Sequence, residues 1–428
     1  MRKVTLLQFA AATYLMVSGG PYGIEELVQN CGYLLALALL FVIPLLWSLP
    51  VGLMVGELAA AIPVEGGFYV WVRRAMGPFW GFQEAWLSLT ASIFDMAVYP
   101  TVFVLSLGKI WAPATQGSNG FLIGAAFVLV CVVWNLFGAR AVGEGSEIIG
   151  ILLLAPFVLM VVFALVHRTG GGSAGPPARP DWAGGILVAM WNYMGWDNAS
   201  TIAGEVENPQ RTYPRVMLLA LAATVVSYVI PITAVWKMGI PPGDWATGSW
   251  VRFASLAAGQ WLGFATLLGA MISTLGSFNA LTLTLSRLPM VMAEDGYAPR
   301  FLARTFSNGV PWAAILTCGV GWIAVLPLNF DRLLILDILL YGASLVLEFI
   351  ALARLRVLEP KLHRPFVVPG GQAAAMLLGA GPLALLITAA IRSHDQKLAG
   401  VSALAVGVAI MAAGVAAYGL AEWRRRLS

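Results

Sequence analysis

The chain has 428 residues, of which 59% are hydrophobic and only 11% are charged, and its formal net charge is +4. Soluble domains carry about 25% charged residues, so this composition excludes an ordinary soluble protein and is typical of a chain embedded in lipid. The length accommodates roughly twelve helical spans of ~20 residues each. The apolar runs lack the two-residue alternation of barrel strands, which excludes an outer-membrane barrel.

Twelve apolar segments follow one another along the chain, and we predict that each is a membrane-spanning helix. They lie near residues 4–30, 33–62, 79–111, 119–138, 144–167, 183–206, 213–238, 260–291, 311–328, 332–356, 374–392 and 398–423. The first segment follows Arg2 and Lys3 but lacks the A-x-A-like cleavage site of a signal peptide. We therefore expect it to remain in the mature protein.

Lysine and arginine residues indicate the orientation, because cytoplasmic loops of membrane proteins carry an excess of them. If both termini are cytoplasmic, 17 of the 25 basic residues fall on the inner side, among them the run at 424–426. The sequence therefore predicts a multi-pass protein of the inner (cytoplasmic) membrane with both termini inside the cell. The pI of about 9.0 reflects this bias and gives no support for nucleic-acid binding.

The cysteines and histidines form no recognisable site. They are widely separated in sequence, and no two cysteines have C-x-x-C spacing. The residues are Cys31, Cys131, Cys318, His167, His363 and His394. We therefore expect no metal ion, no cofactor and no disulfide framework.

Two of the apolar segments are interrupted, the first by glycines beside a proline and the sixth by a polar and aromatic stretch. The first has Gly-Gly-Pro at 19–21 followed by Gly23, and the sixth has Trp-Asn-Tyr-Met-Gly-Trp-Asp at 191–197. Two interrupted helices at matching positions of two halves are typical of inverted-repeat transporters, which bind substrate near the bilayer midplane. For the first break alone, a Gly-Pro kink that only helps packing is the alternative interpretation.

Each break leaves backbone amides and carbonyls without helical partners, and a ligand can supply those partners. We therefore predict that the two breaks together form a substrate site. The residues that the breaks contribute are Ser18, Gly19, Gly20, Pro21, Tyr22, Gly23, Trp191, Asn192, Tyr193 and Gly195.

Several short motifs support this interpretation by their order along nearly the whole chain. They are SGGPYGIEE at 18–26, PVEGGFYVWV at 63–72, GFQEAWLS at 81–88, WNYMGWDN and AGEVENP within 191–209, MAEDGYAPRF at 292–301 and RPFVVPGG at 364–371. With them the chain resembles the amino acid, polyamine and organocation permease superfamily. DMAVYP at 95–100 and GILLLAPF at 150–157 are similar to the polyamine-uptake and L-amino-acid-transporter-like branch.

The resemblance implies an all-α membrane protein with twelve transmembrane helices and a LeuT-like fold, in which helices 1 and 6 are discontinuous. The two inverted repeats of five helices would occupy residues 1–182 and 183–360, and the last two helices 361–428. It also implies secondary active transport of a polyamine or an amino acid by alternating access, either proton-coupled (symport) or by exchange (antiport).

Two positions depart from the pattern of many amino acid permeases. Pro21 removes an amide donor that such permeases use to hold a substrate carboxylate, and Glu25 adds an anion nearby. Some relatives have a lysine in the fifth span that stands in for a sodium ion in coupling. In this chain the corresponding residues 148–166 include no basic residue, which speaks against coupling by such a lysine.

Ionisable residues inside a membrane span are costly in lipid and functional by default, and the candidates in this chain are overwhelmingly acidic. The candidates are Glu25, Glu26, Glu84, Asp95, Asp197, Glu205, Asp337 and Glu348. A carboxylate in a partly dehydrated cavity holds an ammonium by a charge-assisted hydrogen bond, which favours a polyamine as substrate. Glu205 ends the sixth segment, where an ion-pair network at the inner face is the favoured interpretation.

Glu25 and Asp197 are the strongest candidates for amine ligands, because each lies within a turn or two of a break. Asp95 is a second amine contact or a proton carrier. For Glu84 and Glu348, a structural hydrogen bond near the cytoplasmic end is the favoured alternative. The candidates for proton coupling are Glu25, Asp95 and Glu84.

Aromatic side chains beside the breaks can cover a bound cation by cation–π contact, although most membrane aromatics pack or lie at the interface. The candidates are Trp191, Tyr22, Tyr99 and Tyr341. Asn279 belongs to a polar stripe in the eighth segment, for which helix packing is the alternative interpretation.

Two other classes of protein are disfavoured. A channel would need a filter sequence or rings of like residues, and an enzyme would need a nucleophile with a base or a metal cluster. The sequence shows none of these. We therefore predict a transporter for a small molecule and no enzymatic activity.

Overall fold

The computed structural model describes residues 3–166, 180–327, 333–393, 397–398 and 401–427. Most of the described chain is helical, in agreement with the predicted all-α class. The α-helices are α1 (Leu6–Val17), α2 (Glu25–Leu46), α3 (Ser48–Ala61), α4 (Gly67–Met76), α5 (Pro78–Gly108), α6 (Asn119–Asn135), α7 (Ala139–Val166), α8 (Trp182–Trp191), α9 (Pro209–Lys237), α10 (Ser249–Ala258), α11 (Gln260–Leu285), α12 (Arg287–Glu294), α13 (Trp312–Val325), α14 (Leu333–Leu358), α15 (Gly371–Leu377), α16 (Ala380–Ser393) and α17 (Ala403–Leu427).

Short elements complete the regular structure. The 3-10 helices are η1 (Ala112–Thr115), η2 (Asp197–Thr201), η3 (Ala203–Glu205), η4 (Pro242–Asp244) and η5 (Arg300–Ala303). Strands β1 (Lys397–Leu398) and β2 (Val401–Ser402) form an antiparallel pair. The basic residues and histidines at 2, 167, 168, 179, 332 and 394, which the sequence analysis used, lie outside the described residues.

Eight helical stretches of the described chain are long and apolar enough to cross a membrane, and four shorter apolar helices of 10–17 residues accompany them. The long stretches are 25–61, 78–108, 139–166, 209–237, 260–294, 336–358, 371–391 and 403–426, and the shorter helices are α1, α6, α8 and α13. Each of the predicted segments overlaps at least one of these helices, so the approximate positions of the apolar helices were predictable from the sequence.

Helices α2, α4, α10 and α17 differ most clearly from the predicted segments. Helix α2 joins parts of the first two predicted segments, which meet in a sharp bend at Gly32, where φ is 71°. Helices α4 and α10 lie outside the predicted segments. The last predicted segment begins at residue 398, whereas α17 begins at Ala403, because Leu398 pairs with Val401 in the strand pair.

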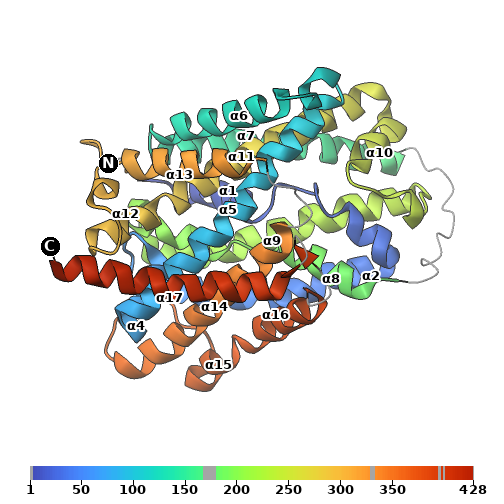
Figure 1. Ribbon diagram of the computed structural model, residues 1–428. Helices are drawn as coiled ribbons and strands as arrows, with labels where there is room; N and C mark the ends of the chain where they lie inside the picture. The colour runs from blue at the N-terminus through green and yellow to red at the C-terminus, as the bar shows by residue number, and fades with distance from the viewer. Residues whose placement is uncertain (1–2, 167–179, 328–332, 394–396, 399–400, 428) are drawn as a thin grey trace.

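The long helices lie side by side in one bundle, and both ends of the chain lie at the same end of it (Figure 1). Helix α10 and the first turns of α2 lie at the opposite end. Helix α1 packs against α7, α9 and α11, and α5 packs against both α11 and α14. These contacts bring the two interrupted segments together with helices α5, α11 and α14 in the middle of the bundle.

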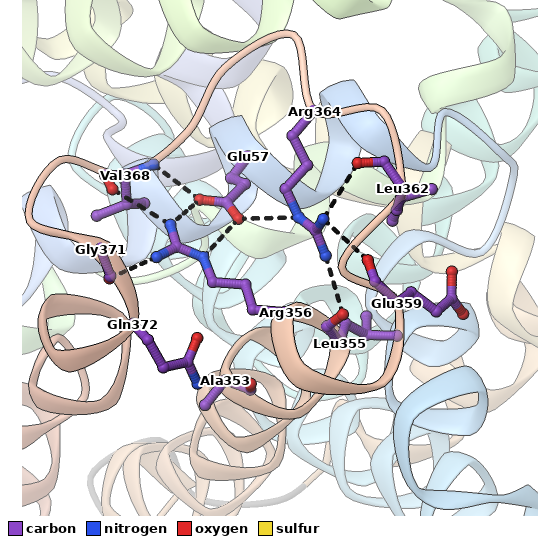
Figure 2. Close-up of polar contacts among 10 residues, drawn as sticks. All are labelled: Glu57, Ala353, Leu355, Arg356, Glu359, Leu362, Arg364, Val368, Gly371 and Gln372. Atoms are coloured by element: carbon purple, nitrogen blue, oxygen red, sulfur yellow. Dashed lines mark hydrogen bonds and ion pairs between the residues drawn. The ribbon is translucent and has the colours of Figure 1, made fainter.

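A buried ion-pair cluster ties α3 to the chain that follows α14 (Figure 2). The Glu57 carboxylate accepts hydrogen bonds from Arg356 and, at 2.7 Å, from the Val368 amide, and Arg364 Nε lies 3.4 Å from it. The Glu57 side chain is 0% exposed and those of Arg356 and Arg364 are 8% and 9% exposed. The cluster therefore fixes the segment between α14 and α15.

We expect Glu57→Ala to lower the free energy of unfolding by about 3–5 kcal/mol, because it leaves two arginines buried without their counter-charge. Unfolding of the purified protein by SDS in mixed micelles measures this change. Glu359→Ala is the matched control, since Glu359 binds Arg74 at 2.5–2.6 Å in a partly exposed pair worth about 0–1 kcal/mol. Equal losses in the two variants would contradict the structural importance of the buried cluster.

Candidate functional site

The first predicted break is confirmed, because the chain leaves helical geometry after α1 and resumes it only at α2. Gly20 and Gly23 have φ of +80° and +90°, which side chains rarely permit. The Gly20 amide donates to Ser18 Oγ at 3.1 Å, and the Gly23 amide donates to Glu25 Oε2 at 2.7 Å. Side chains of the chain itself therefore satisfy these two amide donors.

Neighbouring helices hold this break in place through its carbonyl groups. The Pro21 carbonyl accepts a hydrogen bond at 2.7 Å from Trp250 Nε1 on α10, and the Gly19 carbonyl accepts one from the Ser273 hydroxyl on α11. The Tyr22 hydroxyl donates to the Thr266 carbonyl at 2.7 Å. The break is thus a fixed part of the fold.

The second predicted break is confirmed between α8 and η2. Asn192 Nδ2 donates to the Gly23 carbonyl at 3.2 Å, so the two breaks contact each other directly. The Gly195 amide donates to the Tyr341 hydroxyl oxygen at 3.0 Å, and that hydroxyl donates in turn to Asp197 Oδ1. This chain of bonds fixes the Asp197 carboxyl between η2 and α14.

We expect Gly195→Ala to destabilise the protein by about 1–3 kcal/mol, since φ at Gly195 is +94° and a Cβ would lie 3.0 Å from the Met16 carbonyl oxygen. A thermal melt of the purified protein measures this effect. Gly150→Ala is the matched control, because a Cβ on Gly150, within helix α7, meets nothing within 4 Å. An unchanged melting temperature for Gly195→Ala would show that the break tolerates a side chain.

A cavity of about 500 Å³ lies between the two breaks and helices α5, α11 and α14. The predicted site residues that line it are Gly19, Tyr22, Gly23, Glu25, Asp95, Tyr99, Trp191, Asn192, Gly195, Asp197 and Tyr341. At one end its lining includes exposed residues such as Glu26, Lys109 and Thr247, whereas Leu281 and Leu285, also in the lining, are buried. The cavity therefore opens at one end of the bundle and is closed at the other.

Four largely buried carboxyl groups line this cavity, those of Glu25, Asp95, Asp197 and Asp337. The Tyr99 hydroxyl lies 3.4 Å from both oxygens of Asp95. Among the described lining residues the only basic side chain is Lys109, and it is exposed at the mouth. Such an arrangement favours a cationic ligand.

The other predicted positions lie outside the cavity lining. They are Ser18, Gly20, Pro21, Tyr193, Asn279 and Glu84. The Tyr193 hydroxyl donates to the Leu40 carbonyl at 2.9 Å, and Asn279 Oδ1 accepts from Asn135 Nδ2 at 2.8 Å. These two side chains join helices around the cavity, and Ser18, Gly20 and Pro21 belong to the first break without lining the cavity.

Two contacts near the site are made with residues that the sequence analysis did not assign. The Gly248 amide, before α10, donates to Glu25 Oε1 at 3.1 Å. Arg287 binds Glu205 Oε1 at 2.8 Å, so the ion pair expected for Glu205 exists, and both residues are buried. Asp337 lines the cavity one turn before Tyr341 on α14, and this i, i+4 spacing is the signal that could have placed it there.

Comparison with known proteins is consistent with this geometry. Residues 8–418 match the family described as amino acid permease. The polyamine transporter RMV1 of Arabidopsis thaliana is 32% identical over 96% of this chain and 85% of its own length. The polyamine transporter PUT1 of Oryza sativa subsp. japonica is 32% identical over 96% of this chain and 78% of its own length.

A bacterial relative is similar over most of the chain as well. An uncharacterized transporter of Mycobacterium tuberculosis is 30% identical over 85% of this chain and 78% of its own length. The match to the family covers nearly all of the apolar helices and both breaks. The superfamily predicted from the motifs is therefore confirmed, and the chain is a multi-pass membrane protein that belongs to the amino acid permease family.

Proposed function

We propose that this permease transports polyamines across the cytoplasmic membrane by alternating access, with proton coupling. The observation that carries the proposal is the set of four largely buried carboxyl groups around the cavity, with a basic side chain only at its exposed mouth among the described lining residues. A polyamine has two or more ammonium groups, and charge-assisted hydrogen bonds to carboxylates stabilise each of them. The plant relatives named as polyamine transporters support this choice.

In this proposal Glu25, Asp95, Asp197 and Asp337 are the amine ligands, and Trp191, Tyr22, Tyr99 and Tyr341 cover the aliphatic stretches and the cations. Gly19, Gly23, Asn192 and Gly195 shape the wall with backbone groups. The remaining predicted positions Ser18, Gly20, Pro21, Tyr193 and Asn279 act indirectly, by holding the two breaks and the helices around them.

The alternative is an amino acid permease or an amino acid/amine exchanger, which the family description favours. An amino acid would need amide donors in the first break for its carboxylate. The Gly20 and Gly23 amides already donate to Ser18 and Glu25, and Pro21 has no amide hydrogen. The break therefore supports a ligand without a carboxylate. A channel remains the alternative of a different class.

For the architecture we propose a LeuT-like fold of twelve transmembrane helices. Residues 1–182 and 183–360 would form the inverted repeats, and 361–428 the last two helices. The two broken segments, five predicted spans apart, support this division. With both termini in the cytoplasm, the cavity opens to the outside of the cell, and reporter fusions to each terminus test that orientation.

The experiment that tests the function is uptake into proteoliposomes. Radiolabelled putrescine, spermidine, agmatine and individual amino acids are compared with and without an inward proton gradient. We expect saturable uptake of the polyamines, stimulated by the gradient. Saturable uptake of amino acids alone would favour the alternative permease, and a non-saturating substrate current would favour a channel.

A further inference from the structure

A second pair of acidic residues lies behind the cavity, at Glu84 on α5 and Glu348 on α14. Both side chains are 0% exposed, and neither lines the cavity. Each is eleven residues from an acid of the cavity, Glu84 from Asp95 and Glu348 from Asp337. Eleven residues are three helical turns, so each helix carries two acids on one face about 16 Å apart.

Helices α5 and α14 pack against each other. Asp95 interacts electrostatically with Asp337, and Glu84 interacts with Glu348. The four acids thus form two facing pairs, one in the cavity and one behind it. Asp197 interacts with Asp337 of the first pair and with both members of the second, so it lies between them.

The second pair lacks hydrogen-bond donors. Glu84 Oε1 accepts one bond, at 3.3 Å, from Ser88 Oγ. Glu84 Oε2 and both oxygens of Glu348 accept no hydrogen bond from a donor group of the described residues. A buried carboxylate without donors or a counter-charge is strongly disfavoured, so such a pair binds a cation or a proton.

Charged groups on the surrounding elements are bound elsewhere. Glu57 of α3 binds Arg356 and Arg364, and Arg287 of α12 binds Glu205. On α4, Arg73 binds Asp295 and Arg74 binds Glu359. On α17, Glu422 lies beside Arg425 and Arg426. The charged group that faces the pair is Asp197 from η2. None of the ion pairs of the described chain includes Glu84, Glu348 or Asp197.

The surroundings of the pair indicate which cation it holds. Glu348 interacts with both Glu84 and Asp197. Buried carboxyl groups close to one another cannot all be ionised, so such a cluster retains a proton. Neither Glu84 nor Glu348 lines the cavity, so an amine bound in the cavity does not contact them.

We propose that Glu84 and Glu348 hold the co-transported proton and that Asp197 couples this proton to the amine in the cavity. This rests on the proposed function. An ammonium bound at Asp197 favours its ionised form, so the proton leaves the Asp197 oxygen and joins a carboxylate oxygen of Glu348, and no other bond changes. Substrate and proton then stabilise each other's binding, which is the requirement for symport.

The test separates proton-driven transport from substrate binding. Glu84→Gln and Glu348→Gln are reconstituted and assayed with a solute that the wild-type protein transports in the panel above. We expect gradient-driven accumulation to fall at least tenfold and its dependence on pH to flatten. Counterflow of radiolabelled solute at equal pH on both sides should stay within about threefold of wild type, because the amine ligands are intact.

Two controls make the outcome decisive. Glu348→Asp keeps a carboxyl group and should restore part of the gradient-driven accumulation, which a purely structural role for the longer side chain would not predict. Full accumulation in both Gln variants, accumulation driven by a sodium gradient, or loss of counterflow together with accumulation would each overturn the proposal. If the wild-type protein takes up amino acids only, the proposed polyamine function is refuted. The proton test can then still be carried out with a transported amino acid as the solute.

Discussion

Asp197→Asn is expected to reduce polyamine uptake at least tenfold while the protein still folds. Asparagine keeps the oxygen that accepts the Tyr341 hydroxyl bond, so the local geometry is retained. What is lost is the negative charge, and a hydrogen bond to a charged group is worth about 1.5–3 kcal/mol, or roughly 10–100-fold in binding. Initial uptake rates in proteoliposomes at several substrate concentrations measure this loss.

Asp244→Asn is the matched control for this change. Asp244 lies outside the cavity lining, and its partly exposed side chain binds Arg252 at 2.8 Å. The same chemical substitution should leave uptake unchanged there. If Asp197→Asn transports at the wild-type rate, this carboxyl does not bind the amine. We expect Asp197→Asn to lose both counterflow and gradient-driven accumulation, whereas the Gln variants at Glu84 and Glu348 should lose only the accumulation.

The two helix breaks were predictable because their cause is local. Two glycines beside a proline weaken a helix through backbone freedom and a missing amide donor, so the break at 18–23 could be predicted from the sequence. The break at 191–197 could be predicted because a polar and aromatic stretch interrupts an apolar segment there. The same holds for the apolar helices, whose composition alone sets their environment. The order of the short motifs was equally informative about the family, because the motifs are spread along nearly the whole chain.

What the sequence left open depends on contacts between distant segments. Glu348 had a structural hydrogen bond as its favoured interpretation, yet the structure gives its oxygens no donor and places Asp197 beside it. Glu57 attracted no attention, although two arginines some 300 residues later bind it. An isolated acid in an apolar helix has the same local signature in both cases, and only packing decides which neighbour neutralises it.

Glu25 shows how one side chain serves both the fold and the site. Its two carboxylate oxygens accept the Gly23 amide at 2.7 Å and the Gly248 amide at 3.1 Å, so it joins the first break to the segment before α10. The side chain is only 2% exposed and yet lines the cavity. Its charge is therefore available to an ammonium while its oxygens fix the break.

We expect Glu25→Gln to reduce polyamine uptake at least tenfold, because the charge is lost and the new NH₂ group faces an amide that also donates. Initial uptake rates report the first effect, and thermal melts of the purified protein report the second. Glu144→Gln is the matched control, since Glu144 forms an exposed ion pair with Arg140 outside the cavity. If Glu25→Gln melts at a lower temperature but transports normally, Glu25 serves the fold alone, and the amine site consists of the three aspartates.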